Sequence, residues 1–383
     1  MSSFDAGKPH GLIPFFVPHA GCPQQCTFCN QNRIAAGTTH RLGGHESLVG
    51  AAVTATAVAQ AIDDYIGTTR QQKFWEVAFY GGSFTAIDVK RQEALLAPAY
   101  EALKADRIDG IRCSTRPDAV GDEALKRLQR FGVKTVELGV QSMVPAILAA
   151  AKRGHSAQDT VEAVTRLRRY GFNVGIQLLP GLLGETWQTV LYTTVTIGQL
   201  KPDFVRIYPV LVIEDTELAA QYRAGVYQPL TTEQAIAYSA FMKSYLEAQG
   251  ITVIRTGLQA TEELNRGAGL VAGPYEPAMG ELVANRQWRW RLEACLASYL
   301  ETWGRPKQVM VQYPRSLTSK LRGLKKCNII YFQQHYGTIE WSWEEVTVIG
   351  SKNASETPRS VGAAQHDFEH MVKVVIDGRY FII

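Results

Sequence analysis

Three cysteines stand close together near the start of the chain, in the run Cys22-Pro-Gln-Gln-Cys26-Thr-Phe-Cys29. Thiolates this close in one loop can all bind a single metal centre, and three of them leave one iron of a four-iron cube without a protein ligand. A catalytic centre needs such an open position, whereas a closed site serves structure or electron transfer. The other three cysteines are far apart in the chain, which argues against a disulfide framework.

Two other interpretations of the cysteines remain open. A zinc site would need a fourth ligand, which His19 or His40 could supply, and a redox dithiol would need only Cys26 and Cys29. The spacing C-x3-C-x2-C, placed after a predicted strand in a strand–helix pattern, favours an iron–sulfur cluster over both. Cys22, Cys26 and Cys29 are therefore the predicted metal ligands, and no catalytic residue is assigned beyond them.

Paired glycines end the second predicted strand, in Tyr80-Gly81-Gly82-Ser83-Phe84. Glycines let a ligand approach the backbone closely, although a Gly-Gly pair at a strand end is most often only a turn. After the cysteine loop the pair becomes a candidate contact to a small molecule.

Polar residues also lie at or after the ends of the third and fourth predicted strands and on the fifth, and side chains at the carboxyl ends of the strands form the site of a βα barrel. Each has an ordinary alternative, because single arginines usually make surface ion pairs and single glutamines usually satisfy turns. Their shared placement makes them site candidates: Ser114, Arg116, Gln141, Arg153 and Gln177.

Short β-branched or aromatic runs alternate with helical patterns through the first two thirds of the chain. The predicted strands are Ile13–Val17, Phe74–Tyr80, Gly110–Ser114, Thr135–Val140, Asn173–Leu179, Phe204–Tyr208 and Thr252–Arg255. The predicted helices are Leu48–Ile66, Val89–Ala102, Asp122–Phe131, Ala157–Tyr170, Glu185–Leu200 and Glu233–Ala248. This alternation predicts an α/β fold with a parallel sheet, in the form of a partial or complete (β/α) barrel similar to a TIM barrel.

The character of the chain changes beyond about Gly280. Five tryptophans are concentrated there, and the expected antiparallel strands are Val309–Tyr313, Asn328–Phe332, Thr338–Trp343, Val346–Ile349, Lys373–Ile376 and Arg379–Ile382, with a turn at Asp377-Gly378. We predict a barrel domain over residues 1–285 and a small C-terminal α+β domain over residues 286–383.

Composition limits the location and partners of the protein. No stretch of about 18 apolar residues predicts a membrane span, and the N-terminus lacks the pattern of a signal peptide, so a cytoplasmic protein without membrane contact is expected. The net charge is only +4. However, seven lysines and arginines lie between Arg305 and Lys326 with no acidic residue among them. Such a run is typical of an RNA-binding surface and also of a solvated face.

The cysteine spacing, with Phe28 before the last cysteine, resembles the radical S-adenosylmethionine (radical SAM) superfamily. The resemblance implies a 4Fe–4S cluster and S-adenosylmethionine as cofactors. The backbone of Gly81, Gly82 and Ser83 would contact the methionine amino group, although Ser83 stands where the superfamily usually has Glu. By analogy with oxygen-independent coproporphyrinogen oxidases, Ser114, Gln141 and Gln177 match positions at the cofactor ribose, and Arg153 matches one that pairs its carboxylate. Phe28, before the last cysteine, and Arg116, after the third predicted strand, are also assigned to the cofactor site.

Segments 206–213, 255–259 and 272–282 bring the resemblance closer to the radical SAM domain of the Elongator catalytic subunit and to short bacterial Elongator-like proteins. It covers roughly residues 13–285. The chain departs from Elongator in its closer first two cysteines, and about 100 residues after the barrel are few for an acetyltransferase domain.

The resemblance implies reductive cleavage of S-adenosylmethionine to a 5′-deoxyadenosyl radical, with a reduced flavodoxin or ferredoxin as electron donor. tRNA is a candidate substrate. A small molecule or peptide, or a zinc-binding module without catalysis, are the alternatives.

Overall fold

The chain divides into two compact units, Met1–Pro277 and Ala278–Ile383, and each is described by itself. The computed structural model describes residues 10–17, 26–30, 53–68, 73–258, 265, 267, 269–346 and 371–383. The predicted boundary between residues 285 and 286 falls inside the helix Met279–Trp303, and the division into domains 1–285 and 286–383 stays a prediction. No helix in these ranges is long and apolar enough to cross a membrane.

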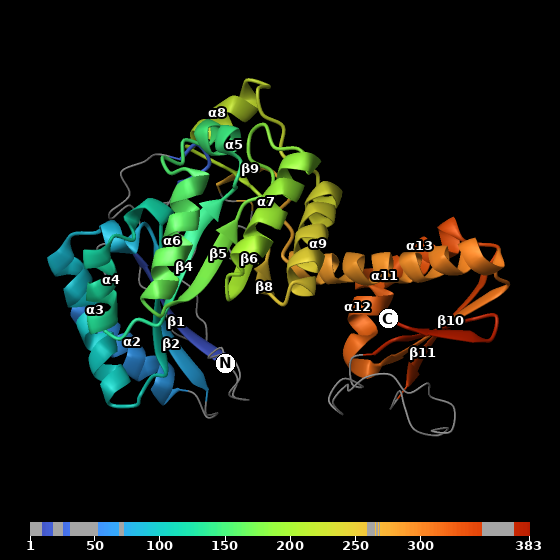
Figure 1. The fold of residues 1–383 in the computed structure, drawn as a ribbon, viewed down its shortest axis with the longest axis horizontal. Helices are drawn as coiled ribbons and strands as arrows, with labels where there is room; N and C mark the ends of the chain where they lie inside the picture. The colour runs from blue at the N-terminus through green and yellow to red at the C-terminus, as the bar shows by residue number, and fades with distance from the viewer. Residues whose placement is uncertain are drawn as a thin grey trace. The chain divides into compact units, whose positions relative to one another are not determined.

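A seven-stranded parallel sheet forms the first unit (Figure 1), and its strands follow one another in chain order. They are β1 (His10–Val17), β2 (Phe74–Gly81), β3 (Gly110–Thr115), β4 (Thr135–Gln141), β5 (Asn173–Leu178), β6 (Phe204–Ile207) and β8 (Thr252–Thr256). Because β1 and β8 stand at the two edges, the sheet is a half-barrel, which confirms the predicted partial (β/α) barrel and excludes a complete one among the described residues.

Helices connect the strands and cover one face of the sheet. They are α2 (Ala55–Gly67), α3 (Val89–Lys104), α4 (Asp122–Arg130), α5 (Pro145–Ala150), α6 (Ala157–Arg169), α7 (Trp187–Leu200), α8 (Glu217–Arg223) and α9 (Thr232–Ala248). Their starts are well specified. Ser156 and Asp159 form a reciprocal capping box at α6, as Thr186 and Thr189 do at α7, so two backbone N–H groups are satisfied at each helix start.

The two faces of the sheet differ in chemistry. On β4, Val136, Leu138 and Val140 lie in the apolar core beneath the helices. Because side chains alternate along a strand, Glu137 and Gly139 face the opposite, inner side. The same inner face carries further polar residues from neighbouring strands, namely Tyr80, Arg112, Ser114, Gln177 and Arg206. The half-barrel therefore has an apolar outer face and a polar inner face.

The predicted strands and helices of this unit are confirmed, with ends that differ by one or two residues for most. The exception is the helix predicted over Leu48–Ile66. Its described part begins at Ala55 after the N-cap Thr54, and its first residues lie outside the described ranges. The short helices α5 and α8, and an antiparallel pair of strands, β7 (Val212–Ile213) and β9 (Leu270–Ala272), were not predicted.

The second unit is an α+β structure, as expected for the C-terminal part. The 25-residue helix α11 (Met279–Trp303) shares an apolar core with a four-stranded sheet in the order β11-β10-β12-β13. The strands are β10 (Gln308–Pro314), β11 (Glu340–Val346), β12 (Lys373–Ile376) and β13 (Arg379–Ile382), and the short helices are α12 (Thr318–Arg322) and α13 (Cys327–His335).

Two predictions for this unit are wrong. Asn328–Phe332 is not a strand but lies in α13, where Asn328 and Phe332, four residues apart, are both fully buried on one helix face. In addition, β10 and β11 pair in parallel, because α12 and α13 carry the chain back across the sheet between them. The turn at Asp377-Gly378 is confirmed, since both residues have positive φ and join the antiparallel strands β12 and β13. Of the strand predicted over Val346–Ile349, only Val346 lies within the described residues, at the end of β11.

Candidate functional site

The described part of the cysteine loop is held by backbone hydrogen bonds from two helices. The N–H of Thr27 donates to the Ala151 carbonyl after α5 at 3.2 Å, and the Thr27 carbonyl accepts from Leu218 in α8 at 2.8 Å. A turn from Cys26 to Cys29 is closed by a 3.0 Å hydrogen bond. The two helices absent from the sequence prediction, α5 and α8, are therefore what positions this loop.

Two of the three predicted cluster ligands lie in this turn. Cys26 is buried and Cys29 is half-buried, and neither forms a disulfide. Cys22 and the two candidate zinc ligands, His19 and His40, lie outside the described residues. Within the described ranges no three metal-binding side chains come together, so the three-cysteine ligand set stays a prediction.

Arg153 connects the cysteine loop to the carboxyl end of β4. Its Nη1 lies 3.1 Å from Cys26 Sγ, and its Nη2 donates to the Gly139 carbonyl at 2.5 Å. The guanidinium also lies over the ring of Phe28, 6.0 Å from its centroid. Since Arg153 is only 6% exposed, its cation is fixed beside a predicted cluster ligand. The sequence prediction placed Arg153 near the cofactor carboxylate, and that role stays a prediction.

Gln141 and His155 complete the polar lining at the end of β4. Gln141 has a positive φ of 73°, an unusual conformation for a residue with a side chain. Burial, together with Arg153, lowers the pKa of His155 to about 4, so the imidazole is neutral at pH 7. Its Nε2 lies 3.2 Å from the Val140 carbonyl and must carry the proton, because a carbonyl can only accept.

Three buried polar atoms in this region have no hydrogen-bond partner among the described residues: Gln141 Oε1, Arg153 Nε and His155 Nδ1. Buried polar atoms are almost always paired in native proteins. The group therefore fits a polar ligand at the end of β4, beside Cys26. His155 stands two residues after Arg153, and no role was predicted for it.

The glycine pair is explained in part by packing. Gly81 has a φ of 110°, and a Cβ at this position would lie 3.0 Å from the backbone of Val17 in β1. The N–H of Gly82 donates to the Val17 carbonyl at 3.2 Å, and Ser83, 1% exposed, starts a short 3-10 helix (η2, Phe84–Ala86). The close approach of β1 thus requires Gly81, and the contact of Gly81, Gly82 and Ser83 with a cofactor stays a prediction.

Arg116 already has a carboxylate partner. Its Nε and Nη2 donate to the two carboxylate oxygens of Asp118, at 2.9 and 2.5 Å. This pairing occupies one edge of the guanidinium. The contacts of Arg116 therefore do not add support for its cofactor role, which stays a prediction.

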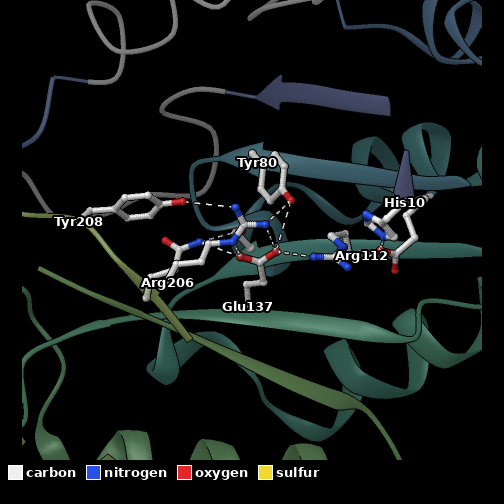
Figure 2. A network of polar contacts seen from close by, with 9 residues as sticks. His10, Tyr80, Arg112, Glu137, Arg206 and Tyr208 are labelled. Carbon is white, nitrogen blue, oxygen red and sulfur yellow. Dashed lines mark hydrogen bonds and ion pairs between the residues drawn. The ribbon is translucent and has the colours of Figure 1, made fainter. Parts of the chain in front are cut away.

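Ser114 and Gln177 meet on the inner face of the sheet, beside a group that sequence reasoning missed. This group centres on Glu137, which is fully buried (Figure 2). Its carboxylate forms an ion pair with Arg206, whose Nε lies 2.8 Å away. It also accepts hydrogen bonds from Arg112 Nη1 at 3.1 Å, Gln177 Nε2 at 3.1 Å and the Tyr80 hydroxyl at 3.3 Å. One carboxylate therefore organises side chains from four other strands or strand ends.

The network continues in both directions from Glu137. Arg206 also reaches the hydroxyls of Tyr208 and Tyr80, at 3.3 and 3.2 Å. On the other side Arg112 forms an ion pair with Glu76, which His10 contacts at 2.6 Å. Burial and the Glu137 charge raise the pKa of Tyr80, so its phenol stays protonated and donates.

A sequence signal for this network does exist. Charged or phenolic residues stand at alternate positions in strands whose other positions are apolar, as in Arg112 between Ile111 and Cys113. The pattern indicates a polar second face.

Two family profiles match the chain. The profile of the Radical SAM superfamily matches residues 16–194, and that of the Radical_SAM C-terminal domain matches residues 202–289, together more than two thirds of the chain.

Curated relatives match over part of their length. A tRNA uridine(34) acetyltransferase of Methanocaldococcus jannaschii is 33% identical over 191 residues, 45% of this chain and 35% of the relative. The heme chaperone HemW of Lactococcus lactis is 26% identical over 192 residues, 48% of this chain and 51% of that protein. The chain thus spans between about a third and a half of these relatives.

A solved structure has the same fold. The archaeal Methanocaldococcus infernus Elp3 with an N-terminal deletion superposes with a TM-score of 0.54 at 23% identity, over 77% of this chain and 64% of that one. The half-barrel, the cysteine loop and the two profiles lead to the same conclusion: the chain belongs to the radical SAM superfamily and is a radical SAM enzyme similar to the Elongator catalytic subunits.

Proposed function

We propose that this enzyme holds a 4Fe–4S cluster on Cys22, Cys26 and Cys29 and cleaves S-adenosylmethionine reductively. The observation that carries this proposal is the cation of Arg153, fixed 3.1 Å from Cys26 Sγ beside three unpaired buried polar atoms. When bound, the cluster and cofactor supply one-electron cleavage of the sulfonium C5′–S bond, which gives a 5′-deoxyadenosyl radical.

The protein's own residues bind and orient the cofactor in this proposal. Arg153, with its fixed guanidinium, pairs with the carboxylate of the methionine portion, since Arg and carboxylate make charge-assisted hydrogen bonds. Gln141, Ser114 and Gln177 face the ribose, and the backbone of Gly81 to Ser83 meets the amino group. Phe28 and Arg116 line the surroundings. The apolar outer face of the sheet keeps water away from the strands that carry these groups.

Anaerobic reconstitution tests the proposal. We expect the wild-type protein, loaded with iron and sulfide and reduced with dithionite, to form 5′-deoxyadenosine from S-adenosylmethionine. The Cys26→Ala variant should form none, whereas Cys295→Ala, which removes a buried cysteine of the second unit, should be fully active. Equal product from wild type and Cys26→Ala would exclude the cluster assignment.

tRNA is the proposed substrate class. Support comes from the name of a relative, a tRNA uridine(34) acetyltransferase, and from the basic run of the second unit. Lys320, Lys325 and Lys326 are exposed there, and no acidic side chain of the described residues pairs with them. Tryptophans of this unit could stack on bases, but Trp341 and Trp343 pack on the buried ring of Phe332, which argues against that role for these two.

A salt titration of tRNA binding tests the substrate. A Lys325→Ala/Lys326→Ala variant should bind more weakly and reduce the slope of log K against log salt by about 2, one for each phosphate that is no longer neutralised. The matched control is Lys104→Ala/Lys126→Ala, which removes the same charge from lysines already paired with glutamates. If both pairs behave alike, the basic run is a solvated face, and a small molecule or peptide becomes the favoured substrate.

Family membership argues against the non-catalytic zinc-binding module. Iron and acid-labile sulfide, measured in anaerobically purified protein, distinguish an iron–sulfur enzyme from a zinc-binding module directly. We further propose a reduced flavodoxin or ferredoxin as the electron donor and the cytoplasm as the compartment, because reducing conditions there protect an iron–sulfur centre.

A further inference from the structure

Glu137 and its partners Arg112, Arg206 and Tyr80 have no role in the cofactor assignment, whereas Gln177 belongs both to that assignment and to the Glu137 network. Glu137 contributes a buried carboxylate with both oxygens occupied by neighbouring N–H groups. Two of these neighbours are guanidinium groups, so the carboxylate is an acceptor toward every neighbour. This fixes the orientation of any partner that has both a donor and an acceptor end.

Gln177 is such a partner. Its side-chain amide has an NH2 end that donates and a C=O end that accepts. Because Glu137 can only accept, the NH2 end must face it, as the 3.1 Å contact from Nε2 to Oε2 requires. The second N–H points to Ser114 Oγ at 3.5 Å. Both protons of the amide are therefore directed into the network, and the carbonyl oxygen is left facing away from it.

The register of the sheet places Gln177 beside the candidate cofactor site. Gln177 is half-buried and pairs in register with Gly139, which has no side chain. A Cβ on Gly139 would lie 3.0 Å from Gln141 Nε2 and 3.4 Å from Arg153 Nη2. Since neighbouring strands are about 4.8 Å apart, the Gln177 amide is next to these two groups.

Ser114 is oriented in the same way. Its hydroxyl oxygen accepts from Gln177, so its own proton is free to donate outward. An acceptor and a donor then stand side by side on neighbouring inner-face positions. A pair of adjacent hydroxyl groups, as on a ribose, matches this pattern.

We propose that Glu137 is a positioning residue that fixes Gln177 with its acceptor toward the ribose hydroxyls of the cofactor. This inference rests on the proposed function and extends it to a residue that does not itself touch the cofactor. Arg112, Arg206 and Tyr80 are the groups that keep the Glu137 carboxylate in place.

The test measures binding of S-adenosylmethionine to the reconstituted, unreduced holoenzyme by anaerobic equilibrium dialysis. Glu137→Gln should raise the Kd about tenfold, the effect of one misdirected hydrogen bond. Of the 2′-deoxy and 3′-deoxy ribose analogues, the one that lacks the recognised hydroxyl should bind wild type and Glu137→Gln equally. Glu76→Gln is the matched control, because it removes the other buried carboxylate of Arg112 and leaves Gln177 untouched. Its Kd should equal that of wild type.

A double-mutant cycle separates positioning from a general loss of structure. In a Gln177→Leu background, Glu137→Gln should have no further effect on the Kd, because Glu137 acts through Gln177. If Glu137→Gln does not fold, Glu137→Asp keeps the charge for the arginines, withdraws the carboxylate from Gln177 and should weaken binding in the same way.

The possible outcomes are distinct. Additive effects in the cycle, or an unchanged Kd in folded Glu137→Gln, would overturn the inference while leaving the proposed function intact. A wild-type holoenzyme that binds no S-adenosylmethionine would instead overturn the proposed function, and with it the inference.

Discussion

Removing Arg112 should destabilise the half-barrel more than removing any surface arginine. Arg112 is 1% exposed and pairs with two carboxylates, Glu76 and Glu137. An Arg112→Met change keeps much of the side-chain volume but leaves both carboxylates without this cation. Breaking a buried ion pair costs about 3–5 kcal/mol. Because Glu137 retains Arg206 and Glu76 retains His10, we expect the lower value, about 3 kcal/mol at pH 7.5.

The stability lost in the Arg112→Met variant should also depend on pH. Burial alone would raise the pKa of Glu76, but hydrogen bonds from His10 and Arg112 and the Arg112 charge hold it below its ordinary value. In the wild type this carboxyl therefore adds stability above its ordinary pKa, and the contribution is lost as the pH falls through the lowered one. Without Arg112 only His10 still opposes the effect of burial, so the pKa of Glu76 should rise, and protonation of Glu76 should recover part of the lost stability. The difference between variant and wild type should shrink between pH 7.5 and pH 5.

Urea unfolding at several pH values measures this prediction. The control is Arg107→Met, because Arg107 pairs with Asp63 where both side chains are about half exposed. An exposed pair contributes less than about 1 kcal/mol, with little dependence on pH in this range. The reasoning fails if Arg112→Met costs no more than Arg107→Met, or if its cost is the same at pH 7.5 and pH 5.

Three further changes should act through other parts of the fold. Gly81→Ala forces a Cβ to within 3.0 Å of the Val17 backbone at a φ of 110°, so we expect a loss of about 1–3 kcal/mol in chemical denaturation, and Gly67→Ala, with open space around it, should lose nothing. Burial raises the pKa of Glu185 to about 7 against hydrogen bonds from the loop backbone. The wild type should therefore lose stability as the pH rises from 5.5 to 8.5, whereas Glu185→Gln should not, in thermal melts. Asn328→Ala removes donors to the carbonyls of Asn285 in α11 and Leu321 in α12, and should lower the unfolding free energy of the second unit by about 1–3 kcal/mol, followed by tryptophan fluorescence.

The sequence was informative where one local pattern determined one element. Alternating strands and helices predicted the half-barrel because each strand has an apolar outer face and each helix one apolar stripe. The pattern failed at residues 328–332, where β-branched and aromatic residues suggested a strand. The deciding interaction there is not local, since the Asn328 amide donates to the carbonyls of Leu321 and Asn285, 7 and 43 residues away in the chain.

Long-range contacts also explain why the roles of some inner-face residues could not be predicted from the sequence. Arg153 and Gln141 follow the fourth predicted strand in the sequence, and the structure brings Arg153 to within 3.1 Å of Cys26 Sγ. Their cofactor roles stay predictions. The residues whose roles were not predicted are those that act through a contact with a residue on another strand. Arg112 alone resembles an exposed strand residue. In the register of the sheet it stands opposite Ala78 and Thr135, and only the folded structure shows that it pairs with Glu76 and Glu137 on the neighbouring strands.

The open form of the half-barrel explains why its inner face needs this network. A closed βα barrel fills its interior with layers of branched apolar side chains. A half-barrel whose first and last strands do not pair leaves its inner face for a ligand, and that face must be polar to recognise one. Polar groups on a sheet are costly when unpaired, so they must hold one another in place before the ligand arrives. Glu137, shared among Arg112, Arg206, Tyr80 and Gln177, does this with a single carboxylate. The network thus holds the polar side chains of the inner face together, and Gln141 Oε1 at the carboxyl end of β4 is among the buried atoms with no partner in the described residues.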